Sequence, residues 1–112
     1  MANTFKLKTK TNVGVTTVGI YTAPASTTTV IIGVTLANTT GAGIHVGVGI
    51  TRPAADVSKE DITLIQDVPI PQGSSFEFMA GNKLVLETED TVTVESDTAN
   101  SLDVALTIME QT

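Results

Sequence analysis

Apolar and polar residues alternate along the last quarter of the chain, from Leu84 to Ile108. The apolar residues at even positions are Leu84, Leu86, Val92, Val94, Leu102, Val104, Leu106 and Ile108. Successive side chains of a strand point to opposite faces, so this period is typical of strands that bury one face. Turn-forming residues interrupt it at 89–90 and at 97–101. The pattern predicts three antiparallel strands with apolar inner faces and polar outer faces.

The same alternation occurs in the first half of the chain, at 27–37 and at 44–51. The apolar residues that share a face are Val30, Ile32, Val34 and Leu36 in the first stretch and Ile44, Val46, Val48 and Ile50 in the second. The segment 38–43 between them is rich in Thr and Gly, so the two strands are expected to form a hairpin.

Shorter strands complete the predicted fold. They are expected at 5–10, 13–21, 62–67 and 76–79. Turn residues separate these segments, and Pro69 and Pro71 indicate an edge strand or a crossover beside them. Eight or nine short strands with frequent turns predict an all-β fold, a single-domain antiparallel β-sandwich that is jelly-roll-like and spans residues 1–112.

The composition supports a β fold and narrows the classes of partner. Hydrophobic residues make up 41 %, enough for a core, and Val, Ile and Thr favour strands. The chain has no cysteine, which excludes disulfides and thiolate metal sites and suits assembly in a reducing cytoplasm. The polar start has no signal-peptide pattern, and no apolar run approaches the ~20 residues of a membrane helix, so no membrane partner is expected.

Charge is distributed unevenly along the sequence. The net charge is −6, and an acidic chain repels phosphate backbones, so nucleic acid is not an expected partner. Half of the six basic residues are Lys6, Lys8 and Lys10. Segment 1–11 is therefore expected to be either an edge strand, whose lysines discourage unwanted pairing, or a basic arm that docks on an acidic neighbouring subunit.

Residues 11–51 contain no Asp, Glu, Lys or Arg. A free monomer normally distributes charge over its exposed faces, so this stretch suggests a surface that another chain covers. The alternative is a neutral surface solvated by Thr hydroxyls. Glycines inside strands add to the first interpretation, because they often mark a close approach of another backbone. The expected interface residues are Lys6, Lys8, Lys10, Gly33, Thr35, His45, Gly47 and Gly49.

The sequence contains no recognisable catalytic motif. His45 is the only histidine, it has no Ser/His/Asp or Cys/His context, and one His cannot form a His-rich zinc site. Carboxylates that could suggest a glycosidase are Glu87, Glu89, Asp90 and Glu95. The three glutamates fall on the predicted solvent face, and aromatic residues that could stack on a sugar are few. We therefore expect no enzyme, catalytic residue, metal or cofactor.

Calcium binding is left open by two acidic groups. They are Asp56 with Glu60 and Asp61, and Asp97 with Asn100. Oxygen ligands of this kind suit calcium, but neither group has the ligand spacing of an EF-hand loop.

Several segments, in their order along nearly the full chain, support a resemblance to a known class of protein. They are 1–6 (MANTFK), 20–25 (IYTAPA), 32–40 (IGVTLANTT), 68–75 (VPIPQGSS), 83–87 (KLVLE) and 101–106 (SLDVAL). The arrangement resembles small all-β virion proteins of tailed bacteriophages, especially those of marine and cyanobacterial hosts. The resemblance implies a non-enzymatic structural subunit located in the virion.

The function expected from these observations is adhesion within a virus particle. The leading hypothesis is a capsid decoration or cement subunit that acts as a homo-oligomer and binds the major capsid protein or other virion proteins. A tail, neck or fibre-adaptor component is the first alternative. A carbohydrate-binding sandwich module is the second, and it would need an exposed aromatic platform. The aromatic candidates are Phe5, Tyr21, Phe76 and Phe78.

Overall fold

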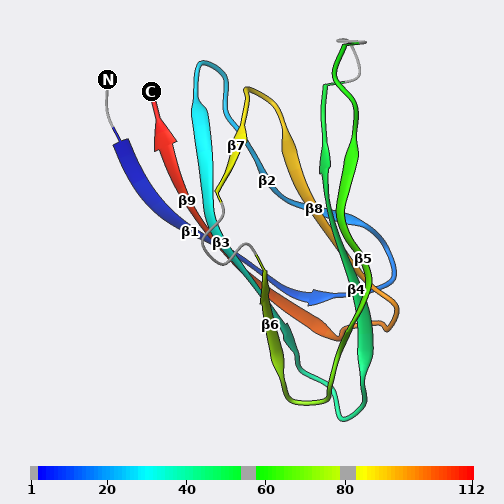
Figure 1. Cartoon of the computed structure of the whole chain (residues 1–112). Coiled ribbons are helices and arrows are strands. Elements are labelled where there is room, and N and C mark those ends of the chain that lie inside the picture. Colours follow the sequence, from blue (N-terminus) through cyan, green and yellow to red (C-terminus); the bar gives the residue numbers. More distant parts are fainter. Residues whose placement is uncertain (1–2, 54–57, 79–82) are drawn as a thin grey trace.

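The structure, a computed structural model, describes residues 3–53, 58–78 and 83–112 and consists of nine β-strands (Figure 1). The strands are β1 (Asn3–Val13), β2 (Val18–Thr22), β3 (Thr28–Asn38), β4 (Ile44–Thr51), β5 (Ile62–Ile70), β6 (Ser75–Phe78), β7 (Leu84–Leu86), β8 (Thr91–Ser96) and β9 (Leu102–Gln111). The described residues contain no helix, and so none that could cross a membrane. The prediction of an all-β chain with eight or nine strands is confirmed.

The strands form two antiparallel sheets that face each other (Figure 1). The first sheet has the order β1-β9-β3-β6, with β7 also paired to β3. The second sheet has the order β2-β8-β4-β5. Because chain neighbours such as β1 and β2, β3 and β4, and β8 and β9 lie in different sheets, the chain wraps around the core as a jelly roll. The predicted antiparallel, jelly-roll-like sandwich is confirmed.

The predicted hairpin of β3 and β4 is wrong, because the two strands belong to opposite sheets. Their apolar faces meet across the core instead of lying side by side. Asn38 holds the corner between them, since its Nδ2 donates to the carbonyl oxygens of Ala42 at 2.8 Å and Ile70 at 3.0 Å. The strand expected at 13–21 is divided by a similar crossing, between Val13 in β1 and Val18 in β2.

The predicted faces of β3 are wrong for its first residues, because the strand contains a β-bulge. The register with β9 shifts between Ile31 and Gly33, which adds one residue and reverses the alternation. Ile31 is fully buried, whereas Val30 and Ile32 do not belong to the core cluster. Val34 and Leu36, beyond the bulge, are buried as predicted.

The core lies between the sheets and is almost entirely aliphatic. The four even-numbered apolar residues of β9 are all buried, and so are Val92 and Val94 of β8. Tyr21 is the aromatic residue in this buried cluster. The alternation therefore identified the inward positions of the closing strands correctly, and the outer faces of the two sheets hold the candidate sites.

Candidate interaction surfaces

A row of apolar residues crosses four strands on the outer face of the first sheet. Phe5 of β1 is paired with Met109 of β9, Met109 with Val30 of β3, and Val30 with Val85 of β7. Phe5 is 69 % exposed and Val85 is 56 % exposed. Leu7, two residues along β1 on the same face, is 65 % exposed. Large apolar side chains thus gather on a face that the described residues leave open.

This part of the first sheet also lacks charge. We define the uncharged face as Phe5, Leu7, Thr9, Val30, Gly33, Thr35, Val85, Ala105, Thr107 and Met109. The charged residues that border it in the described part of the sheet are Lys83, just before β7, and Glu77 and Asp103 at the far end. Thr35 Oγ1 donates to Glu77 Oε2 at 3.3 Å and marks the boundary. Contiguous exposed apolar surface of this kind is typical of interaction sites.

The lysines of β1 lie on the opposite side of the strand from Phe5 and Leu7. The cross-strand partners of Lys6, Lys8 and Lys10 are Ile108, Leu106 and Val104, which all face the core. The lysines therefore point inward at the open edge of the sandwich. Charged residues that point inward from an edge strand are one way by which proteins prevent unwanted strand pairing.

Two of these lysines contact a network at the edge of the core. Lys6 Nζ lies 2.8 Å from Glu110 Oε1, and Lys8 Nζ lies 5.9 Å from the centre of the Tyr21 ring. The Tyr21 hydroxyl donates to Glu110 Oε2 at 2.6 Å and lies 2.8 Å from Thr29 Oγ1. These contacts join β1, β9 and β3 of the first sheet to β2 of the second sheet.

The same contacts shift two pKa values in opposite directions. Hydrogen bonds from Lys6 and then from Tyr21 lower the pKa of Glu110 below its ordinary value of 4.5. Burial, and then the hydrogen bond to Glu110, raise the pKa of Tyr21 to about 12. The folded state therefore favours a charged Glu110 and a neutral Tyr21.

Replacing Glu110 by Gln is expected to lower the melting temperature at pH 7 and to reduce its dependence on pH. A carboxylate whose pKa is lowered by folding stabilises the folded state above its ordinary pKa, and this contribution is lost as the pH falls through the folded value. The difference in melting temperature between the variant and the parent protein should therefore become smaller below about pH 4.5. Thermal unfolding followed by circular dichroism from pH 3 to pH 7 measures it. The exposed Glu95→Gln is the control, and an equal pH dependence of both variants would contradict the assignment.

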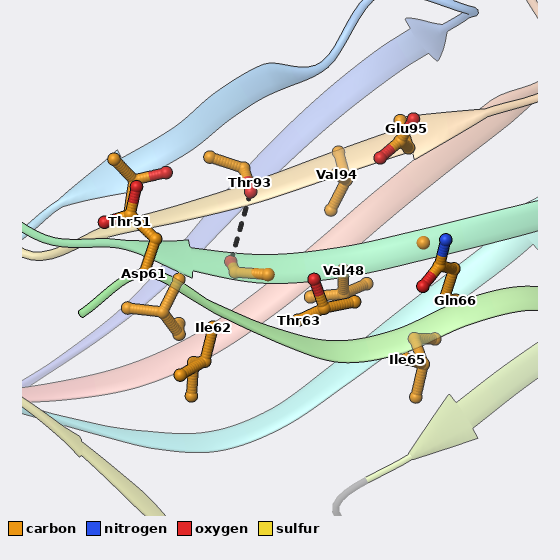
Figure 2. A pocket seen from close by; sticks show the side chains of 13 residues that line it. Val48, Thr51, Asp61, Ile62, Thr63, Ile65, Gln66, Thr93, Val94 and Glu95 are labelled. Atoms are coloured by element: carbon orange, nitrogen blue, oxygen red, sulfur yellow. Dashed lines mark hydrogen bonds between the residues drawn. The ribbon is translucent and has the colours of Figure 1, made fainter.

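A polar groove lies on the outer face of the second sheet (Figure 2). Its volume is about 240 Å³, and Gly47 and Gly49 of β4 lie between the β5 and β8 residues that line it. Thr93 Oγ1 of β8 donates to the Gly49 carbonyl oxygen at 3.2 Å. Glu95 of β8 and Asp61 beside β5 add carboxylates to the lining. This face therefore differs from the uncharged face in being acidic and hydrophilic.

The glycines of β4 are explained by contacts inside the chain. A Cβ atom at Gly49 would lie 2.8 Å from the Ile62 carbonyl oxygen, and one at Gly47 would lie 3.4 Å from the Ile65 carbonyl oxygen. The register between β4 and β5 shifts on both sides of Val48, so the β5 backbone crowds β4 at these points. Gly33 has nothing within 4 Å of the position of a Cβ. Of these three glycines, Gly33 alone faces open space.

Gly49→Ala is expected to reduce the free energy of unfolding by about 1–3 kcal/mol, because the added methyl group must displace the β5 backbone. Gly33→Ala is the matched control, since it adds the same atom in open space and should change stability by about 1 kcal/mol or less. Urea unfolding of both variants gives the two values. Equal destabilisation at the two positions would show that the close approach of β5 is not what requires glycine at position 49.

His45 connects the start of β4 to the turn after β8. Its backbone N–H donates to Asp97 Oδ1 at 3.1 Å, and its Nδ1 lies 3.2 Å from Asp97 Oδ2. The backbone hydrogen bond from His45, followed by the one from the Thr98 hydroxyl, lowers the pKa of Asp97. These bonds attach the start of β4 to the turn after β8.

No group of three or more His, Cys, Asp or Glu side chains that could hold a metal occurs among the described residues. Asp56, considered for calcium, lies outside them. Asp97, the acidic member of the second calcium candidate, accepts the hydrogen bonds of the His45 turn.

The carboxylate of Asp90 is buried and has a structural role that the sequence did not reveal. Arg52 Nε donates to Asp90 Oδ1 at 3.0 Å, and the Glu87 backbone N–H donates to Asp90 Oδ2 at 2.9 Å. Arg52 Nη2 also lies 2.6 Å from Glu87 Oε1. Two of the carboxylates considered for sugar hydrolysis are thus ion-paired with one arginine.

Among the side chains that the structure describes, the aromatic candidates are not gathered into one platform for a sugar ring. Tyr21 is buried and its hydroxyl is engaged, and Phe76 packs against the core. Phe5 is exposed. The side chain of Phe78 lies outside the described part. Among the residues that line the polar groove, none is aromatic.

The eight expected interface residues therefore lie in three places. Gly33 and Thr35 belong to the uncharged face, the three lysines line the inner side of β1, and His45, Gly47 and Gly49 lie on the second sheet. The structure does not bring them together into one site. The exposed apolar members of the uncharged face were missed, although the positions between the lysines already placed Phe5 and Leu7 on the other face of that strand.

Comparison with solved structures finds chains of similar fold. No protein-family model and no curated protein matches the chain. A subunit of the endospore appendages of Bacillus, described as disulfide-linked pili, is 19 % identical, with a TM-score of 0.52 over 99 % of this chain and 87 % of that chain. This chain has no cysteine and cannot form such links.

Two chains from virus particles share the fold as well. A protein of the T13 particle of infectious bursal disease virus (IBDV) is 11 % identical, with a TM-score of 0.60 over 96 % of this chain and 30 % of that chain. A protein of the IBDV Gx strain is 13 % identical, with a TM-score of 0.55 over 96 % of this chain and 33 % of that one. The chain thus spans about a third of these viral proteins, and the likeness at such identity shows the fold.

Proposed function

We propose that this chain is a non-enzymatic structural subunit of a tailed-bacteriophage particle, attached to the capsid as a decoration or cement protein. The observation that carries the proposal is the uncharged face, where Phe5, Leu7 and Val85 are exposed together. An isolated subunit gains nothing from exposing these side chains to water, whereas a subunit that binds its neighbours buries them. The jelly-roll fold, found also in chains of a pilus and of virus particles, agrees with a building role.

The size of the uncharged face indicates how attachment works. Strands lie about 4.8 Å apart and rise about 3.3 Å per residue, so the face covers roughly 300 Å² of sheet. A stable interface buries about 800 Å² per partner. One such contact is therefore weak, and firm attachment requires several contacts at once. We accordingly propose that the subunit acts as a homo-oligomer on a repeating surface of the major capsid protein or of other virion proteins.

Antibody labelling of intact virions tests this proposal. Gold particles distributed over the capsid are expected, together with an oligomer in sedimentation and binding of the purified chain to capsids that lack it. Label confined to the tail, neck or fibres would show that the protein is a component of those parts and does not decorate the capsid. Unlabelled virions, or a monomer that does not bind such capsids, would contradict the proposal.

A further inference from the structure

The free edge of β1 is the longest regular strand edge among the described residues (Figure 1). From Asn3 to Lys10 it pairs with β9 without a register shift, and its other side belongs to no ladder. The edge opposite β1 is divided between β6, with four residues, and β7, with three. In the second sheet, β2 has five residues and a register shift, and β5 has two shifts and Pro69. Among the strands that the structure describes, β1 alone thus offers an unbroken edge to an added strand.

The two faces of this edge strand have different chemistry. Lys6, Lys8 and Lys10 line its inner side, and Phe5 and Leu7 line its outer side. Within the described part of the chain, Lys10 has no ion-pair partner and is exposed. An added strand would place alternate side chains next to the lysines and the others next to the apolar pair. The edge therefore selects a strand that alternates acidic and apolar residues.

We propose that β1 binds an extended acidic segment of a different polypeptide, which joins the first sheet as an additional strand. Main-chain hydrogen bonds to β1 supply affinity in this mode of recognition, and the alternating side chains supply specificity. Carboxylates on one face of the segment lie beside the lysine row, and apolar residues on its other face extend the row that begins at Phe5. The inference concerns the edge of the sheet and does not depend on which particle contains the protein.

A second copy of this chain fits the same edge less well. A two-fold axis perpendicular to the sheet would pair β1 with its own copy and place both lysine rows on one side. Like charges directly opposite one another on adjacent strands are destabilising. Strand β1 contains no Asp or Glu. If β1 paired with its own copy, no carboxylate of the partner strand would therefore offset the repulsion between the lysines.

Binding of synthetic peptides tests the proposal with the intact chain. The probe is a capped peptide of alternating Glu and Val, and its control carries N-methyl groups on consecutive amides, so that neither of its edges can donate hydrogen bonds to β1. The probe is expected to bind at least about tenfold more tightly than the control, because the control keeps the charge but cannot complete the ladder. Amide hydrogen exchange measured by NMR should slow at residues 3–10 when the probe is bound. Equal binding of the two peptides, or protection elsewhere on the chain, would overturn the proposal.

Charge-reversal variants distinguish strand addition at β1 from non-specific electrostatic attraction between the acidic peptide and the lysines of the protein. Lys8→Glu with Lys10→Glu is expected to weaken binding of the probe by at least about fivefold. Lys83→Glu is the control for a single reversal, because Lys83 is exposed and precedes β7 on the other side of the sheet. A comparable loss with Lys83→Glu, or a dimer of the unmodified chain that pairs through residues 3–10, would contradict the assignment of an acidic partner.

Discussion

Replacing Ile31 by Ala is expected to lower the free energy of unfolding by about 2–5 kcal/mol, the usual cost of emptying a buried isoleucine site. Ile31 is 0 % exposed and lies in the core opposite Ile108. Ile32→Ala removes the same atoms one residue later, at the bulge and outside the core cluster, and should cost no more than about 1 kcal/mol.

Chemical unfolding of the two alanine variants measures this difference directly. An uninterrupted alternation along β3 places Ile32 inside and Ile31 outside, and so predicts the reverse order of the two costs. A larger loss for Ile32→Ala would therefore show that the bulge and the strand faces described above are wrong.

Replacing Phe5 and Leu7 together by Thr is expected to reduce binding to capsids that lack the subunit by about a hundredfold per site. Each side chain contributes about 1.5–3 kcal/mol when it becomes fully buried, and about 3 kcal/mol in total corresponds to this factor. Thr is a good strand residue and both positions point away from the core, so the melting temperature should hardly change.

Val15→Thr is the matched control for this experiment. Val15 is 63 % exposed, but it lies in the connection between β1 and β2 rather than on the uncharged face. Cosedimentation with capsids, together with thermal unfolding of each variant, separates loss of contact from loss of fold. Unchanged binding of the double variant would show that the uncharged face does not contact the capsid.

The alternation of apolar residues was sufficient to predict the fold class because it records burial. Val92 and Val94 in β8, and Leu102 to Ile108 in β9, are inside as the even positions indicated. The alternation could not reveal which strands pair, because pairing depends on residues far apart in the chain. For this reason β3 and β4 were expected to form a hairpin, although they lie in different sheets.

The bulge at Ile31 explains the second failure. One additional residue reverses every face before it, and nothing in the run of Val and Ile residues signals the insertion. Gly33 next to it was interpreted as bare surface for a partner, and the structure does leave it open. Gly47 and Gly49 were interpreted in the same way, but the backbone of β5 occupies the space beside them.

The candidate sites were predictable only where they depend on one strand. Alternation between residues 5 and 10 placed the lysines together, but the apolar face opposite them becomes a surface only when Met109 and Val85 join it from other strands. Likewise, the pairing of Asp90 with Arg52 joins residues 38 positions apart, and local sequence contains no sign of it.

We expect a neighbouring polypeptide to cover the uncharged face of the first sheet when the subunit is in place. Cryo-electron microscopy of the native particle, at a resolution that shows side chains, tests it most directly. Phe5, Leu7 and Val85 are expected to pack against another chain, while the polar groove of the second sheet faces solvent. A particle in which the acidic second sheet makes the contacts and these three side chains remain in water would contradict it.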